Sequence, residues 1–155
     1  MCADIYSKMA EVENRHWWFV ARRAIIKRIL TSLNLPTASK ILEIGAGTGG
    51  NLELFGQFGS VFACEANPKA LRIAQDQHGH SITLGSLPNE IPFGAEKFDL
   101  VALLDVLEHV DEPETSLREI GKRLKPEGLV LITVPTYMFL WGKHDELNGH
   151  KRRYR

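Results

Sequence analysis

Residues 41–51, Ile-Leu-Glu-Ile-Gly-Ala-Gly-Thr-Gly-Gly-Asn, decide how this chain is organised. The apolar segment Lys40–Ile44 predicts a strand, and residues 48–58 predict a helix, so the glycines fill the turn between the two. A structural turn needs one or two glycines, whereas this one has four within six residues. Glycines let a ligand approach the backbone closely, and the first amides of the helix offer an anion site. The stretch therefore predicts a ligand-binding loop at the carboxyl end of a strand.

Strand and helix patterns alternate along the rest of the chain. We expect further strands at residues 61–64, 81–84, 98–104 and 129–134, with helices that begin at Asn67-Pro68 and at Glu112-Pro113. Such alternation indicates βαβ units joined by right-handed crossovers. The expected fold class is therefore α/β with a mostly parallel sheet. We also expect an N-terminal helix over residues 7–33.

Composition limits the class of protein. The chain has 155 residues, of which 44% are hydrophobic and 25% charged, so we expect a single globular domain over residues 1–155. No apolar run is long enough to cross a bilayer, and the first residues lack the apolar stretch of a secretion signal, so a cytoplasmic protein is expected. Its two cysteines cannot form a disulfide framework, and Cys64 is expected to be a buried thiol.

Charge is balanced overall but unevenly distributed. The last six residues hold four of the 19 basic residues and no acid, which leaves 15 basic and 19 acidic residues, a net of −4, in the rest. This balance gives no reason to expect a nucleic-acid partner. The basic end is either a phosphate contact or the solvated start of a helix.

The loop alone is compatible with two cofactors. Gly45, Gly47 and Gly50 fit the dinucleotide pattern G-x-G-x-x-G, and Glu65 follows Gly45 by twenty residues, as the ribose-binding acid does in an NAD-dependent oxidoreductase. Glu43 argues against this reading, because a carboxylate two residues before the first glycine would repel a pyrophosphate. A ligand that carries a sulfonium and an ammonium group would be attracted to it.

Four segments, in order, extend the pattern across residues 40–135. They are the loop 43–49, the strand end 65–68, the strand with its following loop at 98–110, and the turn and strand at 124–135. Together they resemble the class I S-adenosylmethionine-dependent methyltransferases. The resemblance implies a Rossmann-like, doubly wound, mostly parallel α/β sheet with the strand order 3-2-1-4-5. It also implies S-adenosyl-L-methionine as cofactor and methyl transfer to a small-molecule or lipid-precursor acceptor. An NAD-dependent oxidoreductase, or an incomplete domain that binds cofactor without turnover, is the alternative.

The resemblance also implies roles for single residues. The glycine loop would line the methionine moiety with Glu43 near its ammonium group, and Glu65 would accept both ribose hydroxyls, unless it is only a solvent-facing strand end. Ser86 stands where the family often has an acid that meets the adenine. Asp105 would face cofactor and substrate, unless it only caps a helix. The implied cofactor-binding residues are Glu43, Gly45, Ala46, Gly47, Gly49, Glu65, Ala66, Ser86, Leu87, Asp105 and Val106.

No catalytic residue is assigned, because methyl transfer from a sulfonium needs alignment more than a dedicated base. His109 is the candidate general base, and its alternative is a structural, hydrogen-bonded histidine. His144 and His150 are candidate substrate contacts. No two of the six histidines have metal-ligand spacing with an acid or cysteine, so no metal is expected.

The expected organisation has three parts. The helix at 7–33 would lid the cofactor with the aromatics of residues 16–19 and pair Arg22 or Arg23 with its carboxylate, unless the aromatics are core and the arginines solvated. Residues 40–135 form the cofactor-binding core, and residues 136–155 begin a substrate region. The resemblance implies two more strands after a further helix, and residues 150–155 look like the opening of that helix, so the domain is expected to be C-terminally incomplete. The exposed edge of the fifth strand would then pair with an ordered tail or with a second copy in a homo-oligomer.

Overall fold

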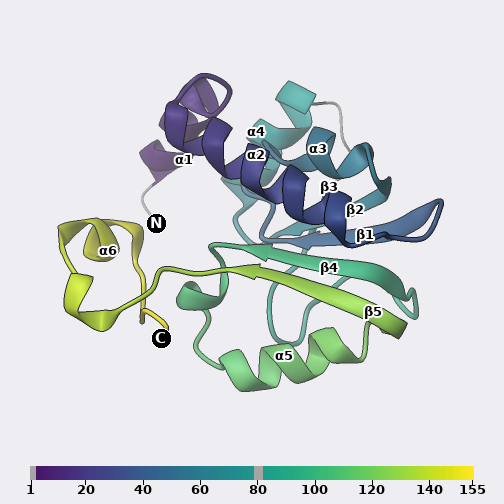
Figure 1. Cartoon of the computed structure of the whole chain (residues 1–155). Coiled ribbons are helices and arrows are strands. Elements are labelled where there is room, and N and C mark those ends of the chain that lie inside the picture. The colour runs from purple at the N-terminus through teal and green to yellow at the C-terminus, as the bar shows by residue number, and fades with distance from the viewer. Residues whose placement is uncertain (1–2, 79–81) are drawn as a thin grey trace.

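A five-stranded parallel sheet forms the centre of the computed structural model, which describes residues 3–78 and 82–155 (Figure 1). The strand order is β3-β2-β1-β4-β5, so the expected α/β class, parallel pairing and order are confirmed. The strands are β1 (Ser39–Ile44), β2 (Gly59–Glu65), β3 (Ile82–Leu84), β4 (Phe98–Leu104) and β5 (Leu124–Thr133). The predicted third strand began at Ser81, which lies outside the described residues.

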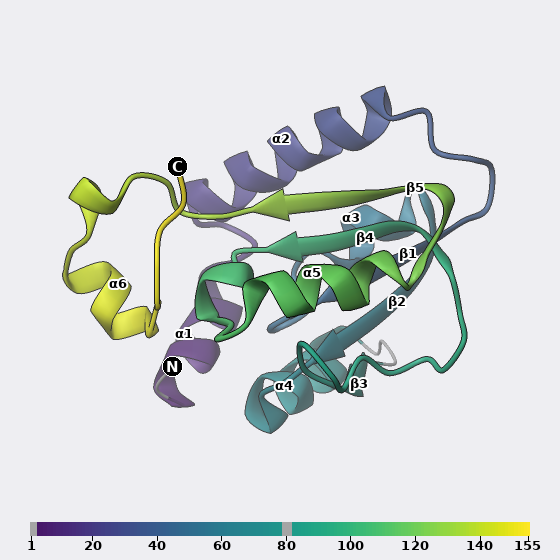
Figure 2. The same ribbon diagram turned by 90° about the horizontal axis from the view of Figure 1, so that it is seen from below.

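Helices cover both faces of the sheet (Figures 1 and 2). One face carries α2, α3 and α4, and the other carries α5. The α-helices are α1 (Ala3–Val12), α2 (Trp17–Ser32), α3 (Leu52–Gly56), α4 (Pro68–His78), α5 (Pro113–Gly121) and α6 (Lys143–Asn148). Two short 3₁₀ turns, η1 (Leu107–His109) and η2 (Met138–Leu140), follow the last two strands. No helix within the described residues is long and apolar enough to span a membrane.

The core has two halves because successive side chains of a strand point to opposite faces. On the face of α2 and α3, Ile41 of β1 packs with Ile26, Leu30 and Phe55. On the opposite face the buried cluster is Leu42, Ile44, Cys64, Ile91, Phe98, Val101, Leu103, Leu107 and Ile120. Cys64 is a free, buried thiol as expected, and burial raises its pKa to about 12. The central strands are thus held from both sides, which fixes where their carboxyl ends lie.

The predicted single helix over residues 7–33 is wrong, because the structure has two helices there. Helix α1 ends at Val12, and His16 caps the start of α2 by accepting a hydrogen bond from the amide of Trp18. The break also lets Glu13 turn inward, where it is buried and accepts a 2.7 Å hydrogen bond from Thr48 Oγ1. A continuous helix would give up that contact with the glycine loop.

The predicted helix at residues 150–155 is also wrong. This segment is extended, and Tyr154 forms a parallel bridge with Thr136 just beyond the end of β5. The Tyr154 amide donates to the Pro135 carbonyl at 2.8 Å, and the Tyr137 amide donates to the Tyr154 carbonyl at 2.7 Å. The tail is therefore ordered, but it pairs beyond β5 and not along it. Among the described residues β5 pairs only with β4.

Candidate active site

A cavity of about 1350 Å³ opens at the carboxyl ends of the strands. Each of the five strands contributes the residue or residues that follow it, represented by Gly45, Ala66, Gly85, Asp105 and Val134. Residues of α1, α2 and the C-terminal segment complete the wall. In a parallel α/β sheet this edge is where ligands bind, so the loops predicted from sequence meet around one space.

The glycine loop after β1 requires glycine at particular positions. Gly45, Gly47 and Gly49 have φ values of +75°, +58° and +87°, which side chains disfavour. A Cβ on Gly45 would lie 2.5 Å from Cγ2 of Val106, so the loop also passes too close to β4's end for a larger residue. Gly45, Ala46 and Gly47 line the cavity, whereas Gly49 is outside the lining.

Glu65 connects the loops that follow β1 and β2. Its Oε2 accepts a 2.8 Å hydrogen bond from the Gly47 amide, and its Oε1 accepts one of 2.8 Å from the Asn67 amide. The side chain is buried and lines the cavity. Two amides thus fix the carboxylate, and each oxygen keeps a lone pair for a further donor. The alternative of a solvent-facing strand end does not hold.

Glu43 lies buried beneath the glycine loop and outside the cavity lining. Its Oε1 accepts a 3.0 Å hydrogen bond from Asn51 Nδ2, and Oε2 has no hydrogen-bond partner among the described residues. Burial raises the pKa of Glu43 to about 8, against the hydrogen bond from Asn51 that lowers it. In this position Glu43 supports the loop from below. A direct contact with a cofactor, for Glu43 as for Gly49, stays a prediction.

The segment after β3 brings Ser86 and Leu87 to the cavity, next to Ala66. Ser86 exchanges two backbone hydrogen bonds with Glu90, of 3.1 and 3.0 Å, and its hydroxyl donates to Glu90 Oε2 at 2.7 Å. The Gly85 amide donates to the Glu65 carbonyl at 3.1 Å, which joins this segment to the end of β2. Ala66, Ser86 and Leu87 therefore all line the cavity, and their contact with the adenine stays a prediction.

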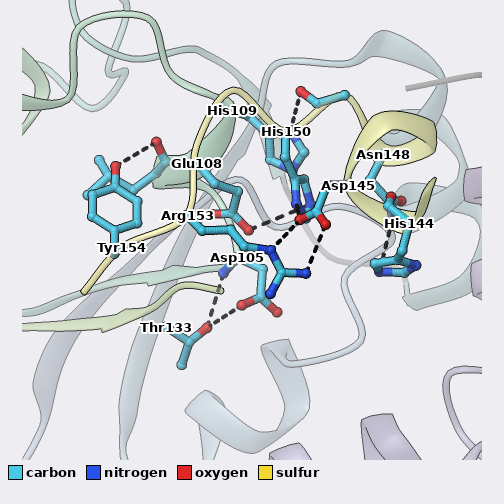
Figure 3. Close-up of polar contacts among 12 residues, drawn as sticks. Asp105, Glu108, His109, Thr133, His144, Asp145, Asn148, His150, Arg153 and Tyr154 are labelled. Atoms are coloured by element: carbon cyan, nitrogen blue, oxygen red, sulfur yellow. Dashed lines mark hydrogen bonds and ion pairs between the residues drawn. The ribbon is translucent and has the colours of Figure 1, made fainter. Parts of the chain in front are cut away.

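Asp105, after β4, ties helix α2 to the sheet. Its Oδ2 accepts a hydrogen bond from Arg22. Its Oδ1 accepts one of 2.9 Å from Thr133 Oγ1 (Figure 3). The residue has a φ of +57°, and no side-chain cap is present on the following 3₁₀ turn, so Asp105 is not a helix cap. Asp105, Val106 and Arg22 all line the cavity. Arg22 Nε is buried without a hydrogen-bond partner among the described residues.

The aromatic residues that begin α2 line the cavity mouth and are not core. Trp17 is 71% exposed and Trp18 is 50% exposed. Arg23, the other candidate for a cofactor carboxylate, donates to the Glu13 carbonyl at 2.6 Å. Of the two arginines, Arg22 therefore lies closer to the residues that follow β4, through its contact with Asp105.

His109 lines the cavity together with its sequence neighbour Glu108 and with His150, which the sequence had not placed near them. His109 Nδ1 is 3.3 Å from the Gly149 carbonyl oxygen. Burial lowers the pKa of His109. Its ring meets the ring of His150 edge to face, with centroids 4.9 Å apart. Ligand-type atoms of Glu108, His109 and His150 all lie within 4.8 Å of one another. No sequence spacing signals this group, because His150 is brought back only by the fold of the C-terminal segment.

Asp145 is a functional candidate that sequence reasoning missed. It is fully buried, and Arg153 donates to both of its oxygens at 2.8 Å (Figure 3). His150 Nδ1 lies 2.9 Å from Asp145 Oδ1. Hydrogen bonds from Arg153 hold the pKa of Asp145 well below its usual range. An acid and an arginine eight residues apart carry no motif, so only the folded chain reveals the pair.

Comparison with known proteins decides the family. The family model described as "Methyltransferase domain" matches residues 15–154, which is most of the chain. The chain belongs to the class I S-adenosylmethionine-dependent methyltransferase family. This agrees with the resemblance seen in the sequence and disfavours the oxidoreductase alternative.

Curated relatives of this methyltransferase domain include enzymes of quinone metabolism. It is 31% identical over 121 residues to the mitochondrial ubiquinone biosynthesis O-methyltransferase of Schizosaccharomyces pombe, covering 73% of this chain and 44% of that one. It is 27% identical over 107 residues to the demethylmenaquinone methyltransferase of Streptomyces griseus, covering 68% of this chain and 46% of that one. The chain thus spans about half the length of these relatives.

Solved structures share the fold of this methyltransferase domain. CalS10, an amino pentose methyltransferase from Micromonospora echinaspora with S-adenosylmethionine bound, superposes with a TM-score of 0.66 at 21% identity, covering 84% of this chain and 60% of that one. DesVI of Streptomyces venezuelae superposes with a TM-score of 0.67 at 22% identity, covering 79% of this chain and 53% of that one.

Proposed function

We propose that this chain binds S-adenosyl-L-methionine in the cavity and directs its methyl group to a small-molecule or lipid-precursor acceptor. The observation that carries the proposal is the hydrogen bond between the Gly47 amide and Glu65 Oε2, at 2.8 Å. It holds a buried carboxylate against an open glycine loop, which is an arrangement suited to a ribose beside a short amino-acid chain.

The residues that surround the cavity fit this cofactor. A Cβ on Gly47 would meet only the terminal methyl of Met9, at 3.3 Å, so the loop leaves its backbone accessible from the cavity side. Arg22 Nε, buried and without an acceptor among the described residues, is matched to a carboxylate. The volume exceeds the usual range for one drug-sized ligand, which leaves room for cofactor and acceptor together.

Each part of the lining then has a role. Glu65 would accept the ribose hydroxyls, with Ala66, Ser86 and Leu87 around the adenine. Gly45, Ala46 and Gly47 would lie along the methionine chain, with Arg22 at its carboxylate. Asp105 and Val106 would separate cofactor from acceptor. S-adenosylmethionine supplies a methyl group on a sulfonium that leaves as a neutral thioether, so the protein has chiefly to align the acceptor and exclude water.

The part of the cavity wall that α2 forms suits an apolar acceptor. Trp17, Trp18, Ile25 and Ile29 of α2 line the cavity with large apolar surface. The names of the relatives place two of them in ubiquinone biosynthesis and in menaquinone methylation, both of which concern lipid-like small molecules. These observations support a small, apolar acceptor and give no support to a nucleic acid.

Calorimetry with S-adenosylhomocysteine and with NAD⁺ tests the proposal. We expect S-adenosylhomocysteine to bind at micromolar concentrations with one site and NAD⁺ not to bind. Micromolar binding of NAD⁺ alone would restore the oxidoreductase alternative. Binding of S-adenosylhomocysteine without any methyl transfer to quinol precursors would support the reading of a cofactor-binding domain without turnover.

A further inference from the structure

The C-terminal segment, residues 136–155, turns back on itself (Figure 2), and its His150 lines the cavity. The Lys151 amide donates to the Glu108 carbonyl at 2.9 Å, and Tyr154 Oη donates to the Leu107 carbonyl at 3.2 Å. These bonds join the segment to the 3₁₀ turn after β4. The position of His150 is therefore set from both sides, by the segment and by the turn.

The orientation of the His150 ring is fixed by Asp145. The 2.9 Å contact between His150 Nδ1 and Asp145 Oδ1 places the proton on Nδ1, because an ionised carboxylate only accepts. Asp145 is ionised, since it is fully buried yet receives two hydrogen bonds from Arg153 and one of 2.9 Å from the Gly142 amide. His150 Nε2 is thus left with a lone pair.

That lone pair lies within the cavity wall near a buried acid. His150 Nε2 is 4.0 Å from Glu108 Oε1. Figure 3 marks this contact with a dashed line. Glu108 is fully buried, and neither of its oxygens has a hydrogen-bond partner among the described residues. Burial raises the pKa of Glu108 to about 7. The two side chains therefore lie next to each other without a direct hydrogen bond, and both line the cavity, where His150 Nε2 is an acceptor for a hydroxyl group.

We propose that His150 is the catalytic base for an acceptor that carries a hydroxyl group, with Asp145 as its positioning residue. This inference rests on the proposed function. The hydroxyl proton passes to His150 Nε2, and the oxygen's electron pair forms the new C–O bond while the S–CH₃ bond breaks with its pair left on sulfur. The products are the methyl ether, the neutral thioether and an imidazolium, which then releases its proton to water.

His150 is better placed for this step than His109. Asp145 stabilises the imidazolium that forms on His150, as a carboxylate partner does in other histidine bases. The corresponding neighbour of His109 is a carbonyl, 3.3 Å away, and burial and the neighbouring His150 lower the pKa of His109. The positive charge of Arg22, which acts on Glu108, disfavours a divalent metal held by Glu108, His109 and His150.

The experiment uses the chain saturated with S-adenosylhomocysteine and 4-nitrocatechol, a hydroxyl acceptor whose ionisation is visible in its absorbance. Wild type is compared with His150→Gln, which keeps a donor toward Asp145, and with His109→Gln. Lys151→Gln is the matched control, because its side chain forms only an exposed ion pair with Asp111 in the same segment. We expect the bound probe to ionise about one pH unit lower in wild type and in Lys151→Gln than in His150→Gln.

Turnover gives the second readout. With S-adenosylmethionine, kcat should fall about 100-fold or more in His150→Gln and lose its rise with pH, while calorimetry shows unchanged S-adenosylhomocysteine affinity. A probe spectrum unaffected by His150→Gln, or an effect confined to His109→Gln, overturns the assignment. So does a wild type that binds S-adenosylhomocysteine and not the probe, or activity that EDTA removes and Mn²⁺ restores. If wild type does not bind S-adenosylhomocysteine, the proposed function is contradicted, and so is the assignment of His150, which rests on it.

Discussion

The backbone amide of Gly47 donates a 2.8 Å hydrogen bond to Oε2 of Glu65, across the carboxyl ends of the neighbouring strands β1 and β2. The two residues are eighteen positions apart in sequence. Their contact makes the glycine loop and the acidic strand end one unit, because the same carboxylate also holds the Asn67 amide at the start of α4. A change at Glu65 should therefore affect both loop geometry and ligand binding.

Replacing Glu65 by Ala should weaken S-adenosylhomocysteine binding strongly. Hydrogen bonds to a charged group are worth about 1.5–3 kcal/mol, so we expect a loss of affinity of roughly 10- to 100-fold, measured by calorimetry. Glu96→Gln is the control, since Glu96 forms an exposed ion pair with Lys40 away from the cavity lining. Equal affinities in Glu65→Ala and wild type would remove Glu65 from the site.

Gly45→Ala should destabilise the fold. The residue has a φ of +75°, and a Cβ would lie 2.5 Å from Val106 Cγ2, so we expect a loss of about 2 kcal/mol or more in urea unfolding. Adding Val106→Ala to the Gly45→Ala variant should recover the stability that the clash costs and leave the loss that the positive φ causes. Gly56→Ala is the contrast: nothing lies within 4 Å of its Cβ position, and a gain of about 0.4–1 kcal/mol is expected. Similar losses of stability in Gly45→Ala and Gly56→Ala would refute this interpretation of the loop.

Glu43→Gln should remove a pH dependence of stability. The pKa of Glu43 is raised to about 8 in the folded state, above its value of 4.5 when unfolded. The stability that the protonated side chain contributes is therefore present at low pH and is lost as pH rises through about 8. Wild type should lose roughly 1.4 kcal/mol per pH unit relative to Glu43→Gln between about pH 5 and pH 8. Urea unfolding at several pH values measures the difference. A variant that becomes less stable than wild type as pH rises would have the opposite sign and contradict the assignment.

Arg22→Gln should act on one end of the cofactor only. Because Arg22 Nε is buried and has no acceptor among the residues that the structure describes, we expect weaker binding of S-adenosylhomocysteine, by roughly tenfold. Binding of 5′-methylthioadenosine, which has no carboxylate, should be unchanged. Calorimetry with the two ligands on one sample supplies its own control. An equal loss for both ligands would instead assign Arg22 to holding α2 through Asp105.

The alternation of strands and helices predicted the parallel sheet, and the family resemblance implied its order, 3-2-1-4-5. Glu65 could be placed at the end of β2, beside the glycine loop, because its offset from that loop reflects one βαβ unit. The break before His16 was missed, because the apolar spacing continues through it and the reason for the break, the Glu13–Thr48 contact, is tertiary. The Asp145–His150 pair was missed for a similar reason: the tail returns to the cavity through long-range hydrogen bonds that no local pattern encodes.

Three expectations from the sequence stay predictions. A homo-oligomer through the edge of β5 is one, and Leu129 and Val130 on that strand are 38% and 39% exposed. A cytoplasmic location and the absence of a nucleic-acid partner are the others. Sedimentation of the purified chain tests the first directly, because a dimer through β5 should dissociate when Val130 is replaced by Lys.

The most direct test of the central claim is a crystal structure of the chain grown with S-adenosylhomocysteine. The account predicts density in the cavity with the ribose hydroxyls on Glu65, the adenine beside Ala66 and Leu87, and the carboxylate at Arg22. Density for the ligand elsewhere, or an empty cavity in crystals of a chain that binds the ligand in solution, would contradict it.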